Sequence, residues 1–244
     1  MYHRLDPDHL TTTLDQLRAR INDRFPDASL GHVCGELSQM ARAAKARVES
    51  IEKPRLGLRV LIGIVIIAGL SGLLAIAVFV SRYKANTEAL SMIQGIDAGF
   101  NILVLTGGAL YYLVSLEQRS KRRKALADLH RLRSIVHVID MHQLTKDPSA
   151  ALSGGAPTAH SPKRVMSNFE LMRYLDYCSE MLSLTAKLAA LYAQSSRDTA
   201  VIGTVNELEQ LAANLSQKIW QKIMVVEMAE GRRGKGVVQV ERSE

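Results

Sequence analysis

An uncharged apolar run extends from Val60 to Val80 and contains no Asn or Gln. As an α-helix this run would be about 31 Å long, which matches the roughly 30 Å hydrocarbon core of a bilayer. A soluble protein could bury such a helix only in a much larger core than a chain of 244 residues offers. The run therefore predicts a transmembrane helix.

A second uncharged run, from Ala98 to Leu116, would be about 28 Å long as a helix and predicts a second span. Asn101 is the most polar side chain in either run. It is interpreted either as a hydrogen-bonding or pore-lining position, or as a residue with a partner in its own hairpin or near the interface. Small residues let helices approach closely in lipid. The polar and small positions singled out in the spans are Gly72, Asn101, Gly107 and Gly108.

Basic residues flank both spans. Seven basic and two acidic residues lie between Glu117 and Arg133, whereas the connecting segment from Ser81 to Asp97 carries two basic residues. The positive-inside rule then predicts that both termini are cytosolic and that the connection lies outside, in the plasma (inner) membrane of a bacterium. Because the net charge of +7 is concentrated beside the membrane, we expect no nucleic-acid partner.

The densest basic cluster has two compatible interpretations. It fixes topology, and it also binds anionic lipid head groups, at about 1 kcal/mol for each basic residue near the surface. The bilayer is therefore an expected partner. The residues of this cluster are Arg119, Lys121, Arg122, Arg123 and Lys124.

Outside the spans, apolar residues recur every three or four positions, which predicts amphipathic helices. Two helices are expected before the first span, over residues 10–24 and 29–52. The second span is expected to continue as one helix toward Asp147, because no glycine or proline occurs between Ala109 and that residue. A coiled-coil-like seam steps along this helix through Leu129, Leu132, Val136 and Ile139.

The broadest apolar face belongs to the helix expected from Asn168 to Gln194, and Ser167 with Glu170 predicts a capping box at its start. A face this wide is able to contact more than one neighbour, including a second copy or a protein partner. A last helix is expected over residues 199–226. The packing face consists of Tyr174, Tyr177, Met181, Leu184, Leu188 and Leu191.

These elements predict an all-α protein, in which a two-helix transmembrane hairpin joins a cytosolic bundle built from the N- and C-terminal segments. The spans occupy residues 60–80 and 98–116. The expected divisions are an N-terminal helical hairpin (1–54), the transmembrane hairpin (55–117), a juxtamembrane helix (118–147), a linker (148–166), a C-terminal helical hairpin (167–228) and a flexible charged tail (229–244).

Candidate chemistry is sparse. His137, Asp140 and His142 are the best metal ligands, but His142 points away from His137 on a regular helix, so a polar stripe is the favoured interpretation. Cys34 and Cys178 lack metal or redox spacing and are expected to be buried. No phosphate-binding loop or catalytic motif occurs, so we expect no cofactor and no enzymatic activity.

The layout resembles, in architecture only, the SLATT-type two-span membrane effectors of bacterial conflict systems. That resemblance implies that Val60–Val80 and Ala98–Leu116 are paired spans and that Asn168–Val226 is the cytosolic helical part. We expect an oligomeric membrane effector or pore. The alternative is a membrane-anchored scaffold that recruits a soluble partner.

Overall fold

The computed structural model describes residues 4–52, 56–82, 89–146 and 166–240. Every regular element in these ranges is a helix, which confirms the all-α prediction. The chain divides into two compact units. We call Met1–Glu52 with Ala125–Glu244 the bundle, and Lys53–Lys124 the hairpin unit.

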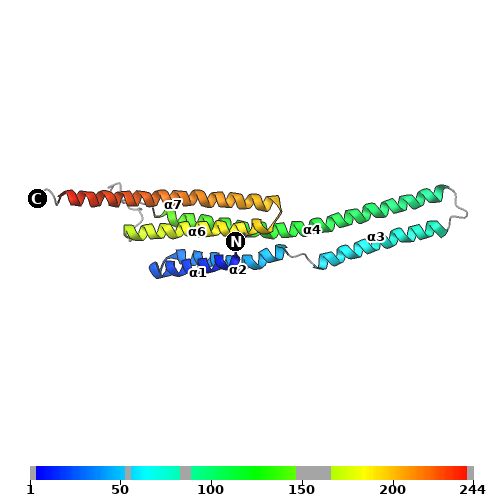
Figure 1. Ribbon diagram of the computed structural model, residues 1–244, viewed down its shortest axis with the longest axis horizontal. Coiled ribbons are helices and arrows are strands. Elements are labelled where there is room, and N and C mark those ends of the chain that lie inside the picture. Colours follow the sequence, from blue (N-terminus) through cyan, green and yellow to red (C-terminus); the bar gives the residue numbers. More distant parts are fainter. Residues whose placement is uncertain (1–3, 53–55, 83–88, 147–165, 241–244) are drawn as a thin grey trace. The chain divides into compact units, whose positions relative to one another are not determined.

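In the bundle, α1 (Pro7–Arg24) and α2 (Ser29–Glu52) run antiparallel (Figure 1). The side chain of Asp6 caps α1 by accepting a hydrogen bond from the backbone N–H of Asp8 at 2.9 Å. Polar bonds tie the two helices along their length, since Ser38 Oγ donates to Asp15 Oδ1 at 2.6 Å and Lys45 pairs with Asp8.

The second pair of bundle helices consists of α6 (Asn168–Ser195) and α7 (Thr199–Val240), which are also antiparallel (Figure 1). The predicted capping box is confirmed at the start of α6, where Glu170 N donates to Ser167 Oγ at 3.2 Å and Ser167 N donates to Glu170 Oε2 at 2.8 Å. Helix α7 continues to Val240, past the end expected at Val226. Its later glycines do not stop it, because a glycine costs only about 1 kcal/mol in a helix interior.

Helix α6 is the central element of the bundle. It packs on α1, α2 and α7, and it reaches α4 (Ala89–Leu144) through a bond from Tyr192 to Asp128. The coiled-coil-like seam of α4 is buried in the same core, with Leu129 and Val136 fully inaccessible. The predicted seam therefore packs within the chain.

The hairpin unit consists of α3 (Leu56–Arg82) and the first part of α4, which run antiparallel (Figure 1). Helix α4 begins at Ala89, within the polar connection expected from Ser81 to Asp97. Polar side chains alone do not end a helix, and no proline occurs between Ala89 and Asp97. Residues 148–165 of the expected linker and 241–244 of the expected tail lie outside the described residues.

Candidate functional site

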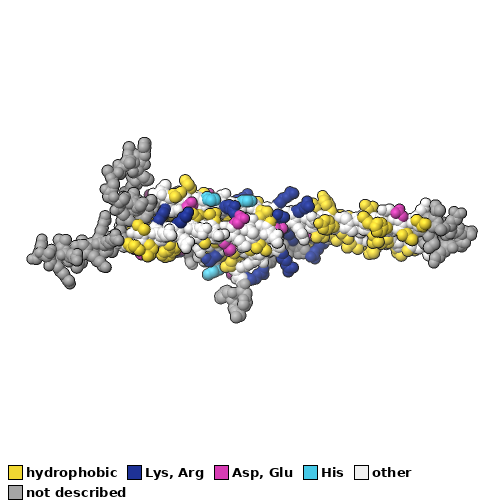
Figure 2. All heavy atoms as spheres, turned by 90° about the horizontal axis from the view of Figure 1, so that it is seen from above, with side chains coloured by type: hydrophobic (Ala, Val, Ile, Leu, Met, Phe, Trp, Pro, Cys, Tyr) yellow, Lys and Arg dark blue, Asp and Glu magenta, His cyan; other side chains and the backbone are white. Residues whose placement is uncertain are grey.

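Two helices, α3 and α4, are long and apolar enough to cross a membrane by length and composition. Only 6% of the apolar window in α3 and none of that in α4 is buried. Large side chains such as Val60 and Leu105 are 62% and 73% exposed. Figure 2 shows hydrophobic side chains covering the hairpin unit. So many exposed apolar side chains on one unit are unusual for a soluble monomer.

Glycines allow α3 and α4 to approach closely within the hairpin unit. A Cβ added at Gly69 would lie 2.8 Å from Thr106 Oγ1, and one added at Gly72 would lie 3.2 Å from Ile102 Cδ1. Gly72, singled out from the sequence as a small span position, therefore lies at a contact between the two helices of the same chain. Small residues in this role are typical of helix packing in lipid.

Asn101 does not face α3. Its side-chain amide donates to Asp97 Oδ2 at 3.3 Å, one turn earlier on the same helix, and both residues are exposed. Asn101 and Thr106 are five residues apart, which places them roughly 140° apart around α4. The sequence left open whether Asn101 bonds to another helix or to a nearer partner. In the single chain its partner is Asp97, on the same helix.

Gly107 and Gly108 also lie away from α3. A Cβ added at either position would meet no heavy atom within 4 Å. The two glycines therefore play no part in the contact within the hairpin unit, and they leave open backbone on the outer side of α4. The polar and small positions of the spans thus divide into an inner contact at Gly72 and an outer surface at Asn101, Gly107 and Gly108.

The predicted lipid-binding cluster forms the end of the hairpin unit's segment of α4. Arg119, Arg122, Arg123 and Lys124 are exposed, and Lys121 is partly buried with its ammonium 2.9 Å from Glu117 Oε1. Four cationic groups within about two turns of helix are thus exposed to solvent, as contact with anionic head groups would require.

The predicted packing face of α6 is entirely inside the bundle. Tyr174 and Tyr177 are 3% and 2% exposed, and Phe25 packs edge-on against both rings. The remaining members, which also lie in the core, are Met181, Leu184, Leu188 and Leu191. The chain's own helices cover this face, so an external partner would need a different surface.

Three helices of the bundle meet at one buried carboxylate, which we call the Asp128 node. Asp128 on α4 is 7% exposed. Its Oδ2 accepts a hydrogen bond from Tyr192 OH of α6 at 3.0 Å and lies 2.8 Å from Arg47 Nε of α2. Burial, and then the neighbouring Asp128 charge, raise the pKa of Tyr192, so that its hydroxyl remains a donor.

The three candidate metal ligands have separate surroundings. His137 is exposed, Asp140 Oδ1 accepts a bond from Gln143 Nε2 at 2.6 Å, and His142 Nδ1 lies 3.3 Å from Tyr174 OH. Burial, and then the charge of Lys146, lower the pKa of His142. Within the described residues, no group of three His, Cys, Asp or Glu side chains could hold a metal ion.

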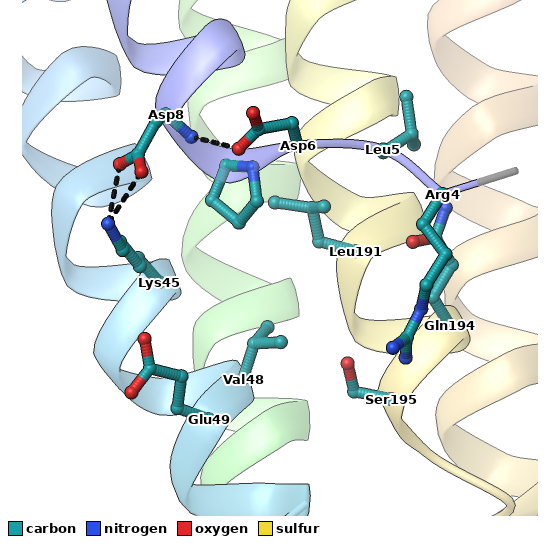
Figure 3. Close-up of a pocket in the computed structure, with 11 residues that line it drawn as sticks. Arg4, Leu5, Asp6, Asp8, Lys45, Val48, Glu49, Leu191, Gln194 and Ser195 are labelled. Carbon is teal, nitrogen blue, oxygen red and sulfur yellow. Dashed lines mark hydrogen bonds and ion pairs between the residues drawn. The ribbon is translucent and has the colours of Figure 1, made fainter. Parts of the chain in front are cut away.

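Among the described residues of the bundle, two open cavities are notable. One, of about 240 Å³, lies between the start of α1 and the ends of α2 and α6, and Lys45 pairs with Asp8 at one side of it (Figure 3). The other, of about 570 Å³, is bounded by the turn between α1 and α2, the end of α4 and the start of α6, and includes His142, Lys146 and Tyr174. Both mix acidic and basic side chains, so neither favours one class of ligand.

The sequence analysis missed the Asp128 node and a set of exposed apolar side chains on α4 and α7, which we call the exposed apolar surface. The sequence offered one signal for the node, since Asp128 directly precedes Leu129 of the coiled-coil-like seam. The exposed surface lies outside the seams, so periodicity alone does not reveal it. Its members are Val138, Met141 and Leu144 on α4, and Trp220, Met224, Val225 and Met228 on α7.

Comparison with protein-family models, with curated proteins and with solved structures finds no match to this chain. The function must therefore be argued from the residues described above.

Proposed function

We propose that this chain is an integral membrane protein that self-assembles and acts on the bilayer, as an effector or pore, with a cytosolic bundle coupled to two spans. The observation that carries the proposal is the continuity of α4 from Ala89 to Leu144. Its first part belongs to the hairpin unit and its last part to the bundle. A single helix is a stiff connection, so a change in the packing of the bundle is transmitted along it to the span.

The Asp128 node fixes the bundle end of this connection. Asp128 is held by groups from α2 and α6, and removing its carboxylate would leave these groups without their partner, at a cost of about 2 kcal/mol. Helix α2 precedes α3 in the chain, and α4 contains the second span. The node therefore joins both helices that lead to the membrane with the central helix of the bundle.

The basic cluster from Arg119 to Lys124 supports a cytosolic bundle. Basic residues next to a span are retained on the cytoplasmic side, and anionic lipids of that leaflet attract them. With both termini inside, the connection from Ser81 to Asp97 lies outside the cell. A reporter enzyme fused after Glu244 is expected to be active only in the cytosol, and activity on the outer side would refute this topology.

The coupling is tested by weakening α4 where the two units join. We compare Gln118→Gly with Ala127→Gly in one chain against Gln118→Ala, since both positions are exposed on α4 on either side of the basic cluster and only glycine makes the helix flexible. Expressed in bacteria, the wild type is expected to depolarise the membrane or admit an impermeant dye. The glycine variant should lose most of this effect and the alanine variant should retain it.

Two results would contradict the proposal. An unchanged membrane potential and dye exclusion at high expression of the wild type would refute the effector or pore. Equal activity of the glycine and alanine variants would refute transmission through a stiff α4. Membrane fractionation of all three chains provides the control for insertion.

The alternative, a membrane-anchored scaffold, is favoured by the exposed apolar surface on α4 and α7. Met141 and Trp220 are 64% and 54% exposed, and exposed aromatic and methionine side chains are typical of protein-binding surfaces. In a scaffold, Met141→Glu would abolish partner recruitment while Asn101→Leu would have no effect. In an effector, Asn101→Leu would impair activity on the membrane.

A further inference from the structure

We propose that α4 packs in parallel against α4 of a second copy of this chain, through the face that carries Gln94, Asn101, Gly108 and Ser115. This inference rests on the membrane location proposed above and names the partner of the second span. The four residues recur every seven positions. Three of them are polar and the fourth is glycine.

A spacing of seven is the repeat that keeps one face of a helix against a partner. Asn101, Gly108 and Ser115 lie within the second span, over residues 98–116, and Gln94 continues the repeat by one heptad beyond the outer end of the span. Helices that pack on a sustained seven-residue repeat form a left-handed coiled coil, and a single Asn at a core position of such a repeat sets its register. Asn101 occupies that position here.

The first helix of the hairpin does not cover this face. Contacts with α3 are made by Ile102 and Thr106, whereas Gln94, Asn101 and Gly108 are exposed. The exposed carboxylate of Asp97 lies beside the face and accepts the Asn101 amide at 3.3 Å. The hairpin unit therefore partly covers one side of α4 and leaves its most polar side open.

Lipid is an unfavourable neighbour for such a face. Polar and ionisable side chains in a span are expensive when they face hydrocarbon, and they generally face other helices or water. Asn side chains form stabilising hydrogen bonds between helices in membranes. A neighbouring helix with polar groups at the same depths in the membrane would form hydrogen bonds with the polar residues of this face.

A second copy in the same membrane meets this requirement directly. Parallel copies carry every residue at the same depth, so Asn101 lies opposite Asn101 of the neighbouring copy, where an amide N–H donates to an amide oxygen. Gly108 lacks a side chain and has no heavy atom within 4 Å of an added Cβ. The backbones of the two copies can therefore approach closely at Gly108, one heptad after Asn101.

The test is disulfide cross-linking in native membranes with copper phenanthroline as the oxidant. Gly108→Cys is compared with Gly107→Cys, since both glycines have open surroundings but lie about 100° apart on α4. Cys34 and Cys178 are fully buried, so the wild type should remain monomeric on a denaturing gel. Gly108→Cys is expected to give at least fivefold more disulfide-linked dimer than Gly107→Cys.

A second pair of chains tests the register. Ser115→Cys is also expected to form the dimer, and adding Asn101→Leu should reduce that dimer severalfold, whereas adding Phe100→Leu should not. Equal cross-linking at Gly107→Cys and Gly108→Cys, or none at either, in protein that fractionates with membranes would overturn this inference and leave the membrane proposal intact. Recovery of the wild type in the soluble fraction would instead overturn the membrane proposal, and this inference with it.

Discussion

Helices α6 and α3 are built from similar apolar residues but use them in opposite ways. In α6 the apolar side chains point into the bundle, and Leu175, Met181 and Leu182 are fully inaccessible. In α3, Ile67, Leu70 and Leu74 are between 62% and 69% exposed. A polar stripe accompanies the apolar face of α6, whereas the apolar character of α3 continues around the whole helix. The comparison shows that the distribution of apolar residues around the helix, more than their number, separates a bundle helix from a candidate span.

The polar groups of the two units also differ. In the bundle, Asp128 is enclosed by Tyr192 and Arg47 from other helices. In the hairpin unit, Asp97 bonds to Asn101 on its own helix and both are exposed. The bundle thus satisfies its buried carboxylate within the chain, while the hairpin unit presents its carboxylate outward. The single tryptophan, Trp220, lies on α7, so its fluorescence reports on the bundle alone.

The largest expected effect is the loss of a side chain from the bundle core. Met181→Ala removes a fully buried side chain and should lower the free energy of unfolding of the bundle by about 3 kcal/mol. Leu105→Ala removes a side chain that is 73% exposed and should leave the free energy of unfolding of the bundle unchanged. Urea unfolding of the full chain in detergent micelles, followed by Trp220 fluorescence and circular dichroism, measures both. A similar loss in the two variants would mean that the units do not unfold separately.

The sequence was sufficient to predict the two long apolar helices, α3 and the first part of α4, and the course of α2 and α6. These elements depend on long, strongly patterned stretches, such as the uncharged Val60–Val80 run and the capping box at Ser167. Helix ends were less predictable. Helix α4 begins at Ala89 and α7 continues to Val240, because polar residues and isolated glycines lower helix stability without stopping a helix.

Partners across the fold could not be predicted from the sequence. The apolar face of α6 suggested a surface for another molecule, but in the fold α1, α2 and α7 cover it. The Asp128 node joins positions that are 64 residues or more apart in the sequence, and no local pattern connects them. The polar side of α4 was predicted in part. Asn101 is a conspicuous polar residue within an apolar run, and this is visible in the sequence without knowing how the helix packs.

A smaller effect is expected when the Asp128 node is broken. Asp128→Ala leaves the buried Tyr192 hydroxyl without its acceptor and Arg47 without its counter-charge, and should destabilise the bundle by about 2 kcal/mol. Asp97→Ala, in the hairpin unit, should not change bundle stability. Asp8→Ala is the matched control within the bundle, because Asp8 pairs with Lys45 at an exposed position and such pairs contribute little to stability. Equal effects of Asp128→Ala and Asp8→Ala would show that the node adds nothing beyond a surface ion pair.

The smallest expected effect is a dependence of bundle stability on pH at His142. Burial, and then the charge of Lys146, lower the pKa of this side chain below its ordinary value of 6.5 in the folded chain. The unfolded chain then binds a proton at a higher pH than the folded chain, so stability falls as the pH drops below 6.5. His142→Gln should remove this part of the loss, and unfolding in urea at pH 7 and pH 5 measures it as the difference between variant and wild type. The effect is confined to the bundle, since His142 contacts Tyr174 of α6. A variant that loses as much stability as the wild type between these two pH values would show that His142 protonates equally in both states.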